Sequence, residues 1–215
     1  MRSENIVQGI SYITIIVSLA VAFGWIFDIT LLKSIMPDYP PMKLVTSSSF
    51  FLAGFITLLL QSNKARRNKV KILFLCILSL LLLLIMLIYL YNTLYDVQNL
   101  QGNAINNLSN EGINDNIYTF LSRPSMISML SFILITLVVL SNIFNLKNSE
   151  KYQIIIGIII SFLGIIAILG YIFNIPGLFY YYGQLNSGMP LHSAILFVFI
   201  GIGIYLIGKD KSYYE

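Results

Sequence analysis

The chain has 215 residues, of which 57% are hydrophobic and only 10% carry a charge. Soluble domains are about 25% charged, so this composition excludes an ordinary soluble domain. The net charge is +4, but the aromatic residues lie inside apolar runs and not on a basic face, so we expect no nucleic-acid partner. The single cysteine, Cys76, cannot form a disulfide within the chain and indicates no compartment.

Several apolar segments are long enough to cross a membrane, whose hydrocarbon core takes about 20 residues of helix. In chain order they are 6–27, 44–60, 72–91, 124–146, 152–173 and 190–208. Ala20 to Ala22 resembles a signal-peptidase site. The end of this segment matches the ends of later segments, so we expect it to remain in the mature protein. The sequence therefore predicts one all-α integral membrane domain, 1–215, with six transmembrane helices.

The segments between these helices carry strong breaking signals or polar residues. Pro37, Pro40 and Pro41 prevent a helix from continuing between the first two segments. An Asn-rich polar loop is predicted for 92–122, with one glycosylation triplet at Asn107, a pattern that is frequent by chance. Pro124 is expected in the first turn of the fourth helix, where its missing N–H costs nothing.

The basic residues indicate the orientation of the chain. One side of the membrane would hold ten lysines and arginines, against three on the other. The ten are Arg2, Lys64, Arg66, Arg67, Lys69, Lys71, Lys147, Lys151, Lys209 and Lys211; the three are Lys33, Lys43 and Arg123. Because lysine and arginine are enriched on the cytoplasmic side, we expect a multi-pass cell-membrane protein with both termini in the cytoplasm.

A related pattern occurs three times: an aromatic helix end, a loop, and a second apolar helix opened by hydroxyl residues. The matching positions are Trp25, Tyr89 and Tyr171; Phe27, Tyr91 and Phe173; Asp28, Asn92 and Asn174; Thr46, Ser128 and Ser193; and Phe50, Phe132 and Phe197. Both flanks of each loop match although the loop lengths differ. This predicts three parallel helical-hairpin repeats, 6–60, 72–146 and 152–208.

In such an arrangement equivalent residues come to one level near the outer membrane boundary. The candidate ligand-binding residues are Trp25, Asp28, Thr46, Tyr89, Asn92, Ser128, Tyr171, Asn174, His192 and Ser193. One interpretation is a pseudo-threefold pocket for a small ligand or a lipid headgroup. The other is structural: the aromatic residues form an interfacial belt, the Asx residues end helices, and the hydroxyls bond between helices. The sequence leaves both open.

Other residues argue against specific functions. His192 has no nearby Cys, His or carboxylate in the sequence and makes a poor metal site, so we expect no metal and no cofactor.

Lys43 and Arg123 precede the second and fourth segments, where contact with lipid phosphates is the default and anion binding the alternative. No charged residue lies centrally in any segment, unlike ion-coupled transporters. No catalytic motif is present, so the chain is not expected to be an enzyme.

Three segments resemble a known signature. Met42–Gly54 reads MKLVTSSSFFLAG and resembles the MKPNTAxxFxLxG signature of multi-pass N-terminal membrane sensor regions of prokaryotic histidine kinases and diguanylate cyclases. Met189–Phe197, MPLHSAILF, resembles the MALHTALxF variant, and Arg123–Phe132 resembles a degraded copy. Leu44–Val45 and Met126–Ile127 stand where Pro–Asn is usual, which removes polar groups from the presumed site.

The resemblance implies a role in receiving a signal. No PAS, kinase or cyclase segment follows Gly208, so we expect a non-enzymatic module that responds to a ligand or to membrane lipids and acts with a separate membrane or cytoplasmic protein partner. A structural accessory subunit is the alternative, and it would bury a small-residue face against another subunit: Ala53, Gly54, Gly157, Gly164, Gly201 and Gly203. A channel or uncoupled transporter would need a continuous polar path, whereas the sequence offers hydroxyls only near the outer ends.

Overall fold

The computed structural model describes residues 2–35, 39–61, 69–103, 123–179 and 188–212. Within these ranges the chain is helical and contains no strand. The elements are α1 (Arg2–Ile26), α2 (Thr30–Lys33), α3 (Leu44–Gln61), α4 (Lys69–Asn103), α6 (Met126–Ile143), α7 (Ser149–Ile172), the 3-10 helix η2 (Pro176–Phe179) and α8 (Leu191–Ser212). All the α-helices except α2, six in number, are long and apolar enough to span a membrane, which confirms the all-helical prediction. Pro37 and Asn107 lie outside the described residues.

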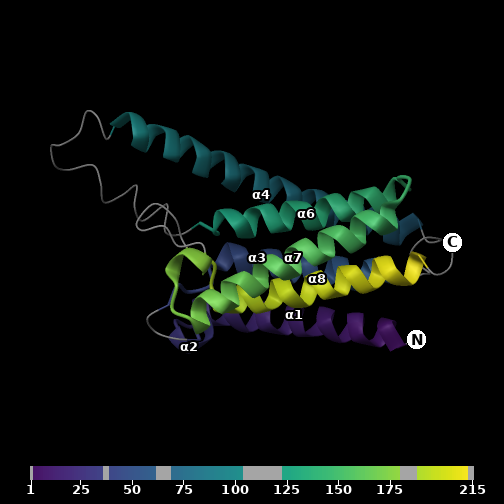
Figure 1. Cartoon of the computed structure of the whole chain (residues 1–215), viewed down its shortest axis with the longest axis horizontal. Coiled ribbons are helices and arrows are strands. Elements are labelled where there is room, and N and C mark those ends of the chain that lie inside the picture. The colour runs from purple at the N-terminus through teal and green to yellow at the C-terminus, as the bar shows by residue number, and fades with distance from the viewer. Residues whose placement is uncertain (1, 36–38, 62–68, 104–122, 180–187, 213–215) are drawn as a thin grey trace.

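The six long helices run side by side, and the two termini lie at the same end of the bundle (Figure 1). We call this the termini end, and the opposite end, where α3, α6 and α8 begin, the hairpin end. The helices pack in sequential pairs, α1 with α3, α4 with α6, and α7 with α8. Sequence neighbours are therefore also neighbours in space, as is usual for helices that cross a membrane one after another.

The pairs contribute one helix each to an inner and an outer layer. In α3, α6 and α8, 50–56% of the spanning residues are buried, against 22–33% in α1, α4 and α7. Helix α3 contacts both α6 and α8. Each outer helix also contacts the inner helix of another pair: α1 packs on α8, α4 on α3, and α7 on α6. The outer helices leave broad apolar faces exposed, which suit a lipid environment.

Three phenylalanines fill the centre of the inner layer. Phe50, Phe132 and Phe197 come from α3, α6 and α8, and each is fully buried. Their ring centroids are 4.7 Å, 4.8 Å and 5.1 Å apart, in tilted or edge-on arrangements that aromatic rings favour. We call these residues the Phe triad. It closes the bundle between the inner helices.

Helices α7 and α8 approach so closely that their backbones touch. A Cβ atom at Gly201 would lie 2.6 Å from the Gly157 carbonyl oxygen and 2.6 Å from the Ser161 nitrogen. A Cβ atom at Gly164 would lie 2.6 Å from the Ala194 carbonyl oxygen. Only a residue without a side chain fits at these positions, and small residues serve the same purpose in many membrane helix pairs.

The prediction that the third apolar segment ends at Tyr91 is wrong. Helix α4 has 35 residues and continues to Asn103, so Asn92 lies inside the helix and not at its end. At 1.5 Å per residue the helix is about 52 Å long, and it reaches beyond the other helices at the hairpin end (Figure 1). Residues 92–103 contain no proline, and their only glycine is Gly102. Nothing in this stretch stops the helix, although its polar composition resembles that of a loop.

The start of α6 also differs from the prediction. Pro124 was expected in the first turn, but the helix begins at Met126 and Ser125 is its N-cap. The Ser125 hydroxyl accepts a hydrogen bond from the Ser128 N–H at 3.2 Å, as a capping serine commonly does. The short helices α2 and η2 were not expected at all, because a single turn between breaking residues has no periodicity to detect.

Helices α1 and α7 end in the same way. Asp28 and Asn174 follow them with positive φ angles of 57° and 53°, in the left-handed region. In this conformation the N–H of the next residue donates a hydrogen bond to a backbone carbonyl of the last helical turn, which would otherwise have no partner. The bonds are Ile29 N–H to Gly24 O, 2.9 Å, and Ile175 N–H to Gly170 O, 2.8 Å. The geometry agrees with the structural interpretation of Asp28 and Asn174, in which they end helices.

This helix end gives a testable prediction. Asn174→Ala should lower the free energy of unfolding by about 1 kcal/mol, because alanine is disfavoured in the left-handed conformation. Asn174→Gly should not lower it, since glycine adopts this conformation without a steric penalty. Unfolding by SDS titration in mixed micelles measures both. Equal stability of the alanine and glycine variants would contradict the assigned helix end.

Candidate functional site

The buried part of the candidate site consists of three hydroxyl residues on the inner helices. Thr46, Ser128 and Ser193 are 2%, 0% and 0% exposed. Each lies four residues before a member of the Phe triad on the same helix, and residues four apart share a helix face. These hydroxyls therefore lie one turn from the Phe triad, toward the hairpin end. We call them the hydroxyl layer.

The members of the hydroxyl layer differ in their hydrogen bonding. The Ser128 hydroxyl bonds to the Ser125 hydroxyl at 2.7 Å. The Ser193 hydroxyl is fully buried and has no hydrogen-bond partner in the part of the chain that the structure describes. A buried hydroxyl without a partner costs about 1–3 kcal/mol. The Ser193 hydroxyl is therefore a polar group left unsatisfied within the described structure.

Two of the candidate aromatic residues connect an outer helix to an inner one. The Trp25 indole N–H donates to the Met42 carbonyl at 2.7 Å, and the Tyr171 hydroxyl donates to the Met189 carbonyl at 2.6 Å. Met42 and Met189 each lie four residues before a member of the hydroxyl layer. Each aromatic residue thus ties the end of its own helix to the start of the paired inner helix. Tyr89, from α4, is half-buried.

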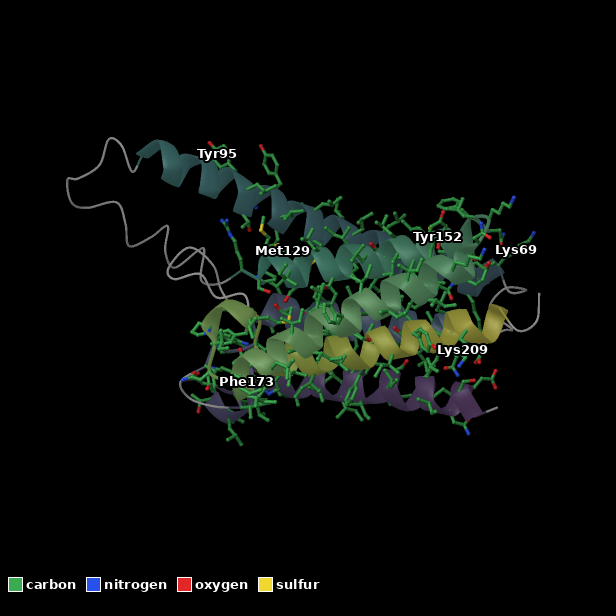
Figure 2. All side chains as sticks on the ribbon, in the orientation of Figure 1. Lys69, Tyr95, Met129, Tyr152, Phe173 and Lys209 are labelled. Atoms are coloured by element: carbon green, nitrogen blue, oxygen red, sulfur yellow. The ribbon has the colours of Figure 1, made fainter. Side chains whose placement is uncertain are left out.

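The loops at the hairpin end cover these aromatic residues. The Lys33 ammonium lies 4.8 Å from the Trp25 ring centroid, a cation–π contact. Phe179 stacks on Tyr171 with centroids 4.5 Å apart. Tyr39, from the loop before α3, packs edge-on against Tyr171 at 4.8 Å. The connections α1–α3 and α7–α8 therefore meet at the hairpin end, where Figure 2 shows the labelled Phe173, opposite Lys69 and Lys209.

The Asx residues of the candidate site are not part of the hydroxyl layer. Asp28, Asn92 and Asn174 are all exposed. The Asp28 carboxylate pairs with the Lys33 ammonium, which holds the pKa of Asp28 below its ordinary value. Since that pKa is lowered, any stabilisation from the pair is present at neutral pH and is lost as the pH falls through it. Asp28 and Asn174 end helices, whereas Asn92 lies on the exposed surface of α4.

His192 lies next to Ser193 in the first turn of α8 and is half-buried. Among the described residues, no group of three or more His, Cys, Asp or Glu side chains lies close enough to hold a metal ion. In this surrounding, His192 can act as a polar neighbour of the hydroxyl layer. Adjacent residues of a helix point in different directions, so the imidazole is not itself part of the hydroxyl layer.

Several residues of the site were missed from the sequence. The capping serine Ser125 had a usable signal, since it precedes an apolar run and another serine follows three residues later. The contacts of Tyr39 and Phe179 had none, because they join loops from distant parts of the chain. Gln153, near the start of α7 and so at the termini end, lies outside this site; it is fully buried, and neither of its amide atoms has a hydrogen-bond partner among the described residues.

The tyrosine that ties α7 to α8 gives a second prediction. Tyr171→Phe keeps the stacked ring but removes the hydrogen bond to the Met189 carbonyl. We expect the free energy of unfolding to fall by about 1 kcal/mol, the usual net contribution of such a bond. Tyr152→Phe is the matched control, because Tyr152 is an exposed residue of the same helix. Equal losses in the two variants would show that the Tyr171 bond contributes nothing.

The chain was compared with protein families, curated proteins and solved structures. No known protein family, no curated protein and no solved structure matches the chain. The hydroxyl layer, the hydrogen bonds of Trp25 and Tyr171 and the charges around them are the features that bear on function.

Proposed function

We propose that this chain is a non-enzymatic, multi-pass membrane module that binds a small ligand or a lipid headgroup at the hairpin end and acts with a separate protein partner. The observation that carries the proposal is the Ser193 hydroxyl, fully buried and without a partner among the described residues. Binding sites are largely apolar with a few placed polar groups. The hydroxyl layer next to the Phe triad has this composition.

The proposal includes three parallel hairpin repeats around an axis through the Phe triad. It is supported by the cyclic contacts of the helices, in which each outer helix packs on the inner helix of another pair. It is also supported by the matching ends of α1 and α7 and by the matching bonds of Trp25 and Tyr171. With the basic residues concentrated at the termini end, the positive-inside rule favours a cytoplasmic location for both termini and an outward-facing hairpin end.

The sensory part of the proposal rests on the resemblance to membrane sensor regions. Met42 and Met189 open the two segments that carry it, MKLVTS and MPLHSA. The carbonyl groups of both methionines accept the bonds from the aromatic residues of the outer helices. A ligand that changes the start of an inner helix would therefore also act on the paired outer helix. Such a coupled movement is what a sensor needs to pass a signal across a membrane.

The accessory-subunit alternative loses its main support. It expected the small residues to form a face for another subunit, but several of them contact each other or other residues of the chain. Gly157 and Gly201 lie against each other between α7 and α8. Gly54 lies against Ser11 and Ile15 of α1. These residues already serve packing within the bundle, so they leave no reason to expect a second subunit on that face.

The channel alternative is disfavoured by the Phe triad. The three rings lie at most 5.1 Å apart and are fully buried, so they close the axis between the inner helices. A conducting path along this axis would need polar groups on both sides of the rings and room between them. Buried hydroxyls lie on both sides of the rings, but those of Thr57 and Thr136 on the termini side bond to carbonyls of their own helices, and the three apolar rings separate them from the hydroxyl layer.

The experiment is purification of the full chain in nanodiscs, followed by native mass spectrometry for bound molecules and identification of co-purifying proteins. We expect a bound small molecule or lipid with the wild-type chain, and a lower occupancy with Ser193→Ala. Ser79→Ala is the matched control, because Ser79 is fully buried in α4 but its hydroxyl bonds to the Cys76 carbonyl. Recovery of no bound molecule and no signalling partner would count against the proposed function.

A further inference from the structure

The three inner helices all begin at the hairpin end. Helix α3 starts at Leu44, α6 at Met126 and α8 at Leu191, and a member of the hydroxyl layer lies in the first turn of each. A helix N-terminus carries about half a positive charge, and its first N–H groups have no acceptor within the helix. Since Phe50, Phe132 and Phe197 contact one another less than two turns into these helices, the partial charges lie near one another. The hydroxyl layer therefore lies in a positive potential.

Only one of the three N-termini has a side-chain cap in the described structure. Ser125 caps α6. Helices α3 and α8 are preceded by Lys43 and Pro190, whose side chains have no oxygen that could accept a hydrogen bond. Their first backbone bonds are Ser47 N–H to Lys43 O and Ala194 N–H to Pro190 O, 2.9 Å and 3.0 Å. The N–H groups before these bonds remain suited to an external acceptor.

Cationic side chains gather at the same helix starts. Lys43 immediately precedes α3, and Arg123 lies three residues before α6. Lys43 is half-buried, and no ion pair is found for it among the described residues. Burial lowers the pKa of Lys43, so its charged form lacks a compensating negative charge. Asp28, the acidic side chain described at this end, is exposed and already pairs with Lys33.

We propose that the ligand of this site carries an anionic group, a carboxylate or a phosphate, which accepts the hydrogen bond of the Ser193 hydroxyl and lies over the first turns of α3 and α8. The inference rests on the proposed function and names the chemistry of its ligand. An anion there would satisfy the buried hydroxyl, interact favourably with the helix N-termini and compensate Lys43. A neutral ligand would satisfy only the hydroxyl, and a cation would be repelled. The same group is found in a free carboxylate or phosphate and, without a cationic neighbour, in the headgroup of a phospholipid with net negative charge such as phosphatidylglycerol.

The experiment measures the thermal unfolding midpoint of the full chain in two settings. In lipid-free non-ionic detergent, the probe is inorganic phosphate against sodium chloride at equal ionic strength. In nanodiscs, phosphatidylcholine with phosphatidylglycerol is compared with phosphatidylcholine alone. We expect a higher midpoint with phosphate if the anion is free, or with phosphatidylglycerol alone if it belongs to a lipid. Either result supports an anionic ligand and identifies its source.

Two variants separate a specific site from general salt stabilisation. Ser193→Ala and Lys43→Gln should each weaken the apparent affinity for the stabilising anion at least about tenfold. The first variant removes a hydrogen bond to the charged ligand, and the second removes a positive charge near it. Ser79→Ala should leave it unchanged. Ser193→Ala should not lower the midpoint without the anion, because the serine hydroxyl has no described partner to lose, and this checks that the variant folds.

The outcomes distinguish this inference from the function on which it rests. If neither phosphate nor phosphatidylglycerol stabilises the chain, but a neutral molecule co-purifies and is lost in Ser193→Ala, the anionic ligand is excluded and the proposed function stands. If the anion stabilises the wild type and both site variants equally, its effect is that of salt alone and the inference fails. If nothing binds and Ser193→Ala changes nothing, both proposals fail.

Discussion

Replacing Phe50 by alanine should lower the free energy of unfolding by about 3–5 kcal/mol, the usual cost of deleting a buried phenylalanine side chain. The Phe50 ring contacts both Phe132 and Phe197, at centroid distances of 4.8 Å and 4.7 Å. All three rings are fully buried between helices from different pairs, so the cavity left by the ring cannot be filled from the surface. SDS titration in mixed micelles or thermal unfolding in detergent measures the loss.

The matched control is Phe162→Ala, since Phe162 lies on α7 with 59% of its surface exposed. It should lose less than about 1 kcal/mol, as surface substitutions usually do. Phe132→Ala and Phe197→Ala should resemble Phe50→Ala if the triad is a single packed unit. A loss in Phe50→Ala no larger than that of the control would contradict the central position of the triad.

The triad shows what the sequence could predict. Phe50, Phe132 and Phe197 occupy equivalent places in the repeated pattern, four residues after a hydroxyl residue that starts an apolar helix. Helical periodicity puts each hydroxyl residue and the phenylalanine four residues later on one face of the helix. Because the pattern is repeated, the three faces are expected to point toward a common centre. Local patterns were sufficient here, because the helices are long and their boundaries are marked by composition. The six apolar helices were predictable for the same reason.

The sequence was less informative about two kinds of feature. One is the end of a helix where no helix-breaking residue marks it, and the other is any contact between distant parts of the chain. Asn92 was expected at a helix end like Asp28 and Asn174, but only the latter two adopt a positive φ angle, while α4 continues past Asn92. The packing of Tyr39 on Tyr171 joins a loop to the end of a helix more than 100 residues away and leaves no local trace. For Ser193, the residue type was noticed, but its complete burial, and the lack of a hydrogen-bond partner among the described residues, depend on how the helices meet.

Gly201→Ala should destabilise the chain by about 1–3 kcal/mol, because the added methyl group must push α7 and α8 apart. Its Cβ atom would lie 2.6 Å from both the Gly157 carbonyl oxygen and the Ser161 nitrogen, and these backbone atoms cannot rotate away as a side chain could. The same helix carries Ser193 and Phe197, so a shift of α8 also moves the hydroxyl layer and the Phe triad. We therefore expect ligand occupancy in nanodiscs to fall together with stability.

The control for this substitution is Gly9→Ala on α1, where no heavy atom lies within 4 Å of the added Cβ atom. There the higher helix propensity of alanine should stabilise the chain by up to about 1 kcal/mol. The same propensity gain acts at Gly201, so the difference between the two variants measures the cost of the close helix contact alone. If Gly201→Ala were as stable as Gly9→Ala, α7 and α8 would not pack backbone against backbone. Ser193 would then lie elsewhere relative to α3, and the proposed ligand site would lose its geometry.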